Sequence, residues 1–212
     1  YIEPKVIRQP QNRIDLIFEI SEGPTTGVSS INFLGNRNFR DRKLKSQLVT
    51  KESKWWKFFS SDDSYDPDKL AYDREQIRKF YLDEGYADFQ VVSAVAELTK
   101  DGKNFVITFV LDEGQIYEFG NSSIESTLEN MNTEELLYLI EHDEGNQYKA
   151  TDIDNTVDAI TLAVGEEGYA SAEVRPRVRR KREEGIVDIV YVLEEGPRVY
   201  IEDSHIHATT RP

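Results

Sequence analysis

The side chains of this sequence that are best suited to chemistry are carboxylates, and two pairs of them are adjacent, Glu166-Glu167 and Glu183-Glu184. Two carboxyl groups can act as general acid and base in a hydrolase when burial raises the pKa of one of them. The first pair falls where a helix is expected to end and the second in an expected turn, so neither carries a burial signal. They are candidates by charge alone, and we expect no catalytic residues and no enzyme.

Metal binding is the second chemistry that the residue types suggest. Four aspartates cluster within residues 62–68, but an EF-hand calcium loop needs Gly at its sixth position and Glu at its twelfth, and neither is in register. His205 and His207 would lie on one face of a strand, as two zinc ligands do, yet no third histidine is near them in the sequence. Because the chain has no cysteine, thiolate-bound zinc and thiol nucleophiles are excluded. We expect no metal and no cofactor.

Composition limits the classes of protein further. The 212 residues include 26 basic and 40 acidic side chains, a formal net charge of −14, and 38% of them are hydrophobic. This apolar content is sufficient for cores and too high for a disordered acidic tail. The acidic balance disfavours nucleic acid as a general partner, because phosphate contacts need a basic surface. Residues 1–7 lack the pattern of a targeting segment, so we expect the chain to begin inside a structural unit.

The elements that must position any site are defined by an internal repeat. Residues 15–24, 106–115 and 188–197 each contain an alternating run of β-branched or aromatic residues that ends at glycine, which predicts a strand stopped by a turn. Residues 65–87 align with residues 148–170 at a constant offset of 83, and both segments carry apolar residues at helical spacing. The first repeat holds about eight extra residues between 49 and 65.

Each repeat is expected to contain a strand, a short helix, a longer helix and two strands. The elements of the first repeat cover residues 28–34, 41–49, 67–83, 89–98 and 105–111, and those of the second cover residues 116–125, 133–141, 152–165, 173–180 and 186–193. This order predicts an α+β fold in which two helices pack on one face of a three-stranded sheet. We expect whole domains at 25–114 and 115–196, the final strands of a preceding repeat at 1–24, and the first strand of a following repeat at 197–212.

Both long helices carry start and stop signals. Asp66 and Pro67 predict an N-cap and a first-turn proline for the first helix, and Thr151 with Asp154 predicts an approximate capping box for the second. Each helix is followed by a glycine that suits the left-handed position after a helix.

Two of the expected strands differ in how their edges are protected. Residues 175–182 contain six basic residues and a proline, which suggests either a patch for nucleic acid or anionic lipid or, as we favour, a guarded edge strand. Residues 89–98 have no proline and one charge, Glu97. If this strand is also an edge, its backbone is open to pairing with another strand. The expected partner-binding or client-binding residues are Gln90, Val91, Val92, Ser93, Ala94, Val95, Ala96 and Glu97.

The extra segment of the first repeat is rich in large aromatic residues, Trp55, Trp56, Phe58 and Phe59. They are a possible contact loop for a partner. The alternative, which we favour, is that these rings cover the helix pair as part of the core.

The tandem unit resembles the POTRA (polypeptide-transport-associated) domain family. The resemblance depends on the strand-helix-helix-strand-strand order, on Glu84-Gly85-Tyr86 and its counterpart at 167–169 after the long helices, and on the Glu-Gly that ends each last strand. In the arms of outer-membrane β-barrel assembly proteins, five such domains precede a membrane barrel, and the third has an insertion between its helices. The insertion with its tryptophans therefore implies the third and fourth domains, with parts of the second and fifth at the ends.

The resemblance implies a non-enzymatic, periplasmic scaffold in an outer-membrane protein of a Gram-negative bacterium. Its implied partners are nascent outer-membrane β-barrel proteins, accessory assembly lipoproteins and its own membrane barrel, with client strands bound by β-augmentation. A POTRA arm of a two-partner secretion or autotransporter-assembly protein is the alternative, and a carboxylate-dependent hydrolase is a distant one. The incomplete repeat at 197–212 also predicts strand-exchange self-association of this fragment, through residues 89–98 of another copy.

Overall fold

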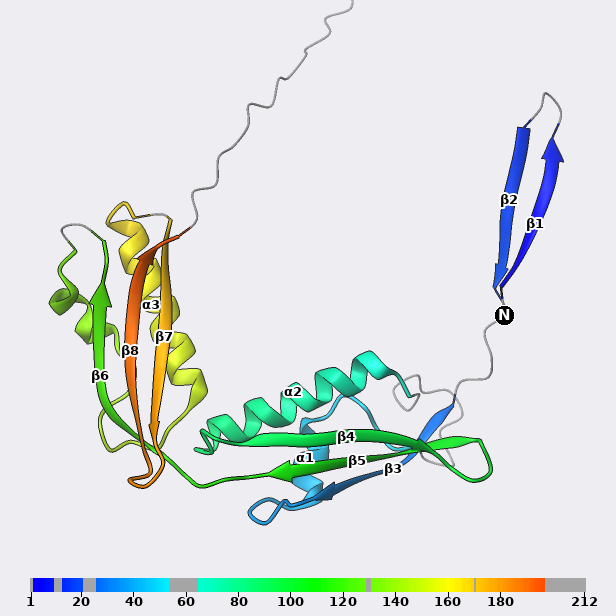
Figure 1. Cartoon of the computed structure of the whole chain (residues 1–212), viewed down its shortest axis with the longest axis horizontal. Helices are drawn as coiled ribbons and strands as arrows, with labels where there is room; N and C mark the ends of the chain where they lie inside the picture. Colours follow the sequence, from blue (N-terminus) through cyan, green and yellow to red (C-terminus); the bar gives the residue numbers. More distant parts are fainter. Residues whose placement is uncertain are drawn as a thin grey trace, which may run out of the picture. The chain divides into compact units, whose positions relative to one another are not determined.

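The computed structural model describes residues 2–9, 13–20, 26–53, 65–128, 131–169 and 171–196. The chain divides into two compact units, residues 1–78 with 91–112 and residues 79–90 with 113–212. Each unit contains one three-stranded sheet (Figure 1). Residues 79–90, which end the long helix of the first repeat and follow it, therefore belong to the second unit.

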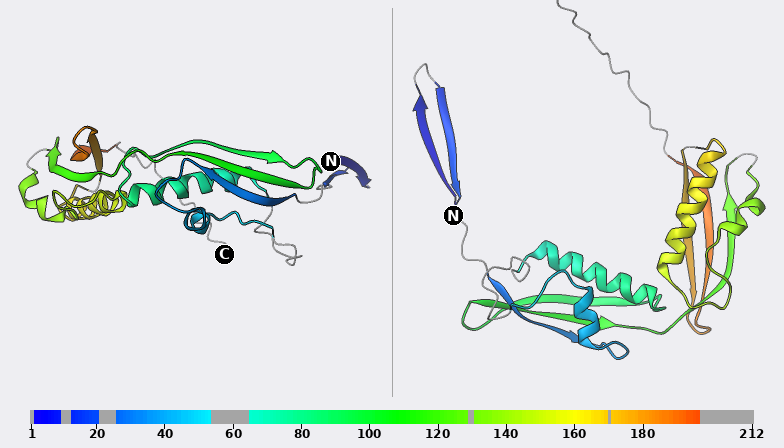
Figure 2. Two further views of the ribbon diagram at one scale, coloured as in Figure 1. Left: turned by 90° about the horizontal axis from the view of Figure 1, so that it is seen from below. Right: turned by 180° about the vertical axis from the view of Figure 1, so that it is seen from behind.

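The sheet of the first unit has the strand order β3-β5-β4. Strand β3 (Gly27–Leu34) runs parallel to the central strand β5 (Asn104–Asp112), and β4 (Gln90–Leu98) forms the other edge. Helices α1 (Asp41–Gln47) and α2 (Pro67–Asp83) lie on one face of this sheet (Figure 2). Alternate strand residues face the helices and form the core with Leu44 and Ile77, namely Ile31, Phe33, Ile107, Phe109 and Leu111.

The N-terminal residues form a separate two-stranded sheet. Strands β1 (Ile2–Gln9) and β2 (Arg13–Ile20) are antiparallel, and their register pairs Ile2 with Ile20. The extended structure expected for this part of the chain is therefore confirmed for the described residues.

The second unit repeats the same arrangement, with the strand order β6-β8-β7. Its strands are β6 (Glu118–Ser126), β7 (Ala172–Lys181) and β8 (Ile186–Glu195), and its helices are η2 (Thr133–Leu139) and α3 (Ala150–Glu166). The core includes Ile160 from α3, the aromatic residues Phe119 and Tyr191 from the sheet, and Leu82 from the segment 79–90. Both units thus have the predicted element order, and the α+β fold class is confirmed.

Two local predictions need correction. The short helix expected at 133–141 is a 3₁₀ helix that ends at Leu139. The capping box expected from Thr151 and Asp154 is wrong, because α3 begins at Ala150 and Thr151 already lies inside it. Instead, Asp83 Oδ1 accepts hydrogen bonds from the Thr151 N–H (2.9 Å) and hydroxyl (2.8 Å). A carboxylate from elsewhere in the unit therefore caps this N-terminus, where the helix dipole favours negative charge.

The remaining helix signals are confirmed. Asp66 Oδ1 accepts a hydrogen bond from the Asp68 N–H (2.8 Å) at the start of α2. Gly85 and Gly168, which follow the two long helices, have φ values of 99° and 100°. These angles lie in the left-handed region that glycine tolerates. Among the described residues, no helix combines the length and the hydrophobicity needed to cross a membrane.

Candidate partner-binding edges and pocket

Strand β4 is an edge strand, which is the condition on which its expected openness to pairing depended. It contains all eight predicted contact residues, Gln90 to Glu97, and the strand order leaves one of its sides without a neighbouring strand in the described part of the chain. Its large side chains are unusually exposed, 63% for Val92 and 47% for Val95. An apolar edge strand without proline is a template for pairing with another strand.

The direction of the β4 amides follows from its hairpin with β5. The Thr99 N–H donates to the Asn104 carbonyl of β5 (2.8 Å). Because amides alternate in direction along a strand, the N–H groups of Glu97 and Val95 also point toward β5, whereas those of Ala96 and Ala94 point away. The outward row is the set of backbone groups that an added strand would use.

The two faces of β4 differ in their surroundings. Val91 is buried on the face covered by the helices, and its neighbour Val92 is 63% exposed on the open face. At the hairpin Thr99 is opposite Asn104, so Val95 shares the open face with Val110 of β5, and the alternation of β4 is interrupted between Val91 and Val95. The open face thus carries the exposed side chains of Val92 and Val95, as well as that of Leu34 on β3.

The opposite edge of the same sheet is closed by a loop. The Val28 carbonyl of β3 accepts a hydrogen bond from the Ser53 N–H (2.7 Å), and the Ile31 N–H donates to Glu52 Oε1 (2.9 Å). The fully buried Asp73 of α2 holds the start of this loop by accepting hydrogen bonds from the N–H groups of residues 49 and 50. Two outer backbone groups of β3, the Val28 carbonyl and the Ile31 N–H, are thus already occupied.

Strand β7 is also an edge strand, and charge guards it as predicted. Its arginines at 175, 177 and 179 alternate along the strand, and Pro176 lies between the first two. Arg175 pairs with Glu173 (2.9 Å), and Arg177 pairs with Glu194 of β8 (3.3 Å). A strand added here would meet arginines and a proline that has no N–H to donate.

The last basic residues of this run have structural partners. A hydrogen bond between Lys181 and Asp188 (2.7 Å) raises the pKa of the lysine and lowers that of the carboxyl group. Arg182 donates from Nε (3.0 Å) and Nη2 (2.7 Å) to Asp88 Oδ2, which also accepts from the Tyr117 hydroxyl (3.2 Å). These two cations are thus engaged within the second unit.

The carboxylate pairs considered for catalysis are not assembled into a site. Glu166 and Glu167 are exposed at the end of α3, and Glu183 and Glu184 are exposed in the turn between β7 and β8. Among the described residues, no group of three His, Cys, Asp or Glu side chains is placed to hold a metal ion. Trp55, Trp56, Phe58 and Phe59, the two histidines at 205 and 207, and residues 197–212 lie outside the described residues.

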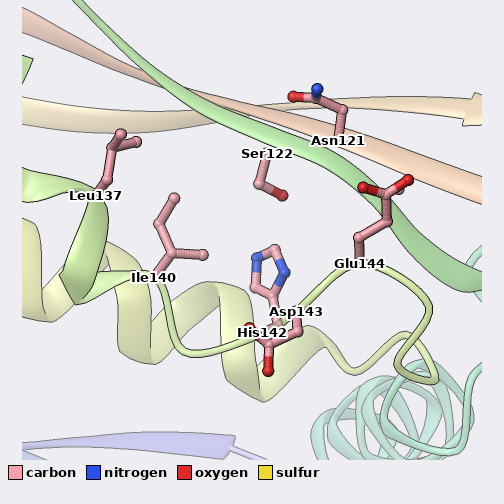
Figure 3. Close-up of a pocket in the computed structure, with 8 residues that line it drawn as sticks. Asn121, Ser122, Leu137, Ile140, His142, Asp143 and Glu144 are labelled. Atoms are coloured by element: carbon pink, nitrogen blue, oxygen red, sulfur yellow. The ribbon is translucent and has the colours of Figure 1, made fainter. Parts of the chain in front are cut away.

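One concave site, which the sequence did not reveal, lies in the second unit between β6, the end of η2 and the loop that follows it. The pocket has a volume of about 310 Å³, and Figure 3 shows Leu137 and Ile140 on one side of it and Glu144 on the other. His142 is 7% exposed, stacks on Phe119 with ring centroids 3.8 Å apart, and shares a hydrogen bond between Nε2 and the Tyr191 hydroxyl (2.9 Å).

Two polar atoms at this pocket lack partners. Within the described residues, neither His142 Nδ1 nor Ser122 Oγ forms a hydrogen bond, and both atoms are buried. Burial lowers the pKa of His142, so the imidazole is neutral at pH 7, and burial raises the pKa of Tyr191 to about 12. An unpaired buried polar group costs about 1–3 kcal/mol, which makes these two atoms a signal that the pocket accommodates something polar.

The fold and the repeated sequence together define the class of this protein. The family model described as surface antigen variable number repeat, the POTRA family, matches residues 26–114 and 117–196. The chain therefore belongs to the POTRA family.

Particular relatives are outer membrane protein assembly factors named BamA. The alignment with BamA of Neisseria meningitidis serogroup B is 29% identical over 205 residues, and it covers 97% of this chain and 26% of that protein. The alignment with BamA of Nitratidesulfovibrio vulgaris is 26% identical over 199 residues, and it covers 92% of this chain and 25% of that protein. The chain thus spans about a quarter of the length of these curated relatives.

A solved structure has the same fold. The crystal structure of POTRA domains 3–5 of Haemophilus influenzae BamA matches with a TM-score of 0.71 at 24% sequence identity. The match covers 87% of this chain and 74% of the other. At this level of identity the likeness concerns the fold alone.

Proposed function

We propose that this chain is a section of the periplasmic arm of an outer-membrane β-barrel assembly protein, and that it is a scaffold without catalytic activity. The similarity to two assembly factors over nearly its whole length supports this proposal. Strands of nascent barrel proteins and accessory lipoproteins are the partners, and the arm holds them by adding their strands to its sheets. This mode suits clients of varied sequence, because the backbone that pairs is common to all of them.

The single observation that carries the proposal is the state of the β4 edge. Of the four edges of the two three-stranded sheets, β3 is covered by the loop at 52–53, and β7 is guarded by Pro176 and arginines. Residues 145–148 cover the beginning of β6, where the Gly145 N–H donates to the Phe119 carbonyl (2.8 Å). Strand β4 alone combines nine residues, no proline and exposed valines in the described part of the chain.

The faces of β4 also indicate which strands it selects. A strand paired with β4 would place alternate side chains beside Val92 and Val95 on the open face, and the others beside Ala94 and Ala96. Strands of membrane barrels alternate apolar and polar residues with this same period of two. The edge therefore favours client strands with one apolar face.

Blocking the backbone of β4 tests the proposal. Ala96→Pro removes an outward N–H without removing a hydrogen bond to β5, and it should weaken binding of an alternating valine–threonine peptide by at least about tenfold. Ala96→Ser keeps the amide and controls for the loss of the alanine itself. Circular dichroism should show that both variants remain folded. Unchanged peptide affinity in a folded Ala96→Pro variant would contradict binding at β4.

The choice of face is tested by a matched pair of variants. Val95→Thr on the open face should reduce affinity for the alternating peptide by up to about fivefold, the range of one cross-strand pair. Ala94→Ser, which adds a hydroxyl on the other face of the same strand, should have a smaller effect. A peptide of equal composition with its valines in adjacent pairs should remove the difference. If both variants weaken the two peptides equally, β4 does not select by face.

A further inference from the structure

The pocket at Ser122 has a counterpart in the first unit, because the two repeats can be aligned through their strand ladders. Ile31 of β3 is opposite Ile107, and Ser122 of β6 is opposite Ile189. In both sheets the ladder contains a register shift just before this residue. The position that holds a buried isoleucine in the first unit therefore holds a serine in the second.

The short helices and the loops after them align in the same way. Leu44 and Leu136 are the buried residues of α1 and η2, which places Lys45 at the position of Leu137. The hydrogen bond from the Ser53 N–H to β3 corresponds to that from the Gly145 N–H to β6, at 2.7 and 2.8 Å. Their preceding residues, Glu52 and Glu144, are therefore equivalent.

In the first unit this place is filled from within the chain. Lys45 Nζ lies 2.7 Å from Glu52 Oε1, and the same oxygen accepts the Ile31 N–H at 2.9 Å. The isoleucine side chain occupies the adjoining core and is 1% exposed. A lysine, its carboxylate and an apolar side chain thus close the site.

The second unit keeps the carboxylate and lacks the other two. Leu137 replaces the lysine, Ser122 replaces the isoleucine, and a pocket of about 310 Å³ is open between them. In the described part of the chain, the exposed carboxylates of Asp143 and Glu144 at its rim form neither a hydrogen bond nor an ion pair. No lysine or arginine lines the pocket.

We propose that this pocket binds a lysine or arginine side chain of a partner polypeptide, in the role that Lys45 has within the first unit. Leu137 and Ile140 form an apolar wall for the aliphatic stem of such a side chain. Asp143, Glu144 and the Ser122 hydroxyl can accept hydrogen bonds from its cationic head, and so can His142 Nδ1 in the tautomer that donates from Nε2 to the Tyr191 hydroxyl. An anion is disfavoured by the two rim carboxylates, and an apolar group would leave Ser122 and His142 unpaired.

This site is separate from the β4 edge, and its test does not depend on client binding there. The probe is N-acetyl-lysine N-methylamide, with the norleucine compound as the uncharged control, titrated into the whole chain. Chemical shifts of the Ser122 amide and the His142 imidazole report binding. We expect saturable shifts with the lysine probe and up to about fivefold weaker binding of the norleucine probe, the size of one partly exposed ion pair.

Variants of the pocket and of its counterpart in the first repeat test the location. Glu144→Gln should weaken binding of the lysine probe by up to about fivefold, whereas Glu52→Gln, whose carboxylate is already held by Lys45, should leave it unchanged. Ser122→Ile should fill the pocket and abolish binding, and Leu137→Lys should supply an internal cation and weaken it.

Three results would overturn the proposal. These are equal binding of the two probes, lysine binding that Glu144→Gln does not alter in a folded chain, or an ordered water bridging Ser122 and His142 with no probe-dependent shift. The last result would identify the pocket as a water site.

Discussion

Removing the carboxylate of Asp73 should release the loop that covers the β3 edge. This side chain is fully buried on α2, and its two oxygens accept hydrogen bonds from the N–H groups of Val49 (2.6 Å) and Thr50 (3.1 Å). Three residues further on, Glu52 and Ser53 bond to the outer backbone of β3. Asp73→Ala therefore removes the anchor of the segment that occupies this edge.

The magnitude follows from the two amides that lose their acceptor. The Thr50 N–H is buried and would be left without a partner, which costs about 1–3 kcal/mol. The bond from Val49 is only partly buried, so water can replace it at a cost of about 1 kcal/mol. Asp73→Ala should thus lower the free energy of unfolding by about 2–4 kcal/mol, a large share of the 5–15 kcal/mol typical of a domain.

Denaturant unfolding measures this loss, and hydrogen exchange at the amides of residues 49 and 50 locates it. The control is Glu75→Ala on the same helix, which removes a half-exposed pair with Arg78 (3.2 Å) and should cost about 0.5 kcal/mol or less. Faster exchange confined to residues 48–53 and their β3 partners would support the anchoring role. The reasoning would be refuted if Asp73→Ala lowered the free energy of unfolding by an amount within about 1 kcal/mol of the control and left hydrogen exchange at the amide of residue 50 unchanged.

Three further outcomes are expected. Burial lowers the pKa of His142 in the folded chain, so the unfolded chain binds a proton at this residue first as the pH falls below about 6.5. The free energy of unfolding should therefore fall between pH 7 and 5, and denaturant unfolding should show a smaller fall for His142→Gln. Asp88→Asn should lower the thermal midpoint of the second unit more than Glu194→Gln does, because Asp88 accepts two bonds from Arg182 and one from Tyr117, whereas Glu194 accepts one from Arg177. Deleting residues 197–212 should abolish concentration-dependent self-association in sedimentation experiments if these residues pair with β4 of a second copy; association that persists would remove that explanation.

The sequence predicted the elements well where local signals and periodicity agree. Helix α2 has the predicted bounds because Asp66 and Pro67 mark its start and a left-handed glycine follows its end. The protection of β7 against strand pairing, and the lack of it in β4, could be predicted because proline and charged side chains prevent pairing at the residues where they occur. The cap of α3 could not be predicted, because Asp83, which provides it, is 68 residues away from Thr151.

The pocket was missed for a related reason. Ser122 and His142 carry no motif, and they become neighbours only when η2 and the following loop pack beside β6 (Figure 3). The signal was present in the comparison of the repeats, where Ile31 is replaced by Ser122 and Lys45 by Leu137. Recognising these replacements required the strand ladders, because the offset between equivalent residues of the two repeats differs between strands and helices. A single offset therefore does not align all of the equivalent residues.

The contrast between the two units explains how one fold can offer different surfaces to partners. In the first unit the β3 flank is sealed by Ile31, Lys45 and Glu52, and the opposite edge, β4, is apolar and open within the described residues. In the second unit the β7 edge is guarded by arginines, and the pocket is on the opposite flank, beside β6. The element order and core pattern are the same in both, so these differences depend on a few side chains at the edges. Exchanging Ser122 and Leu137 for their first-repeat counterparts should therefore close the pocket while leaving strand binding at β4 intact.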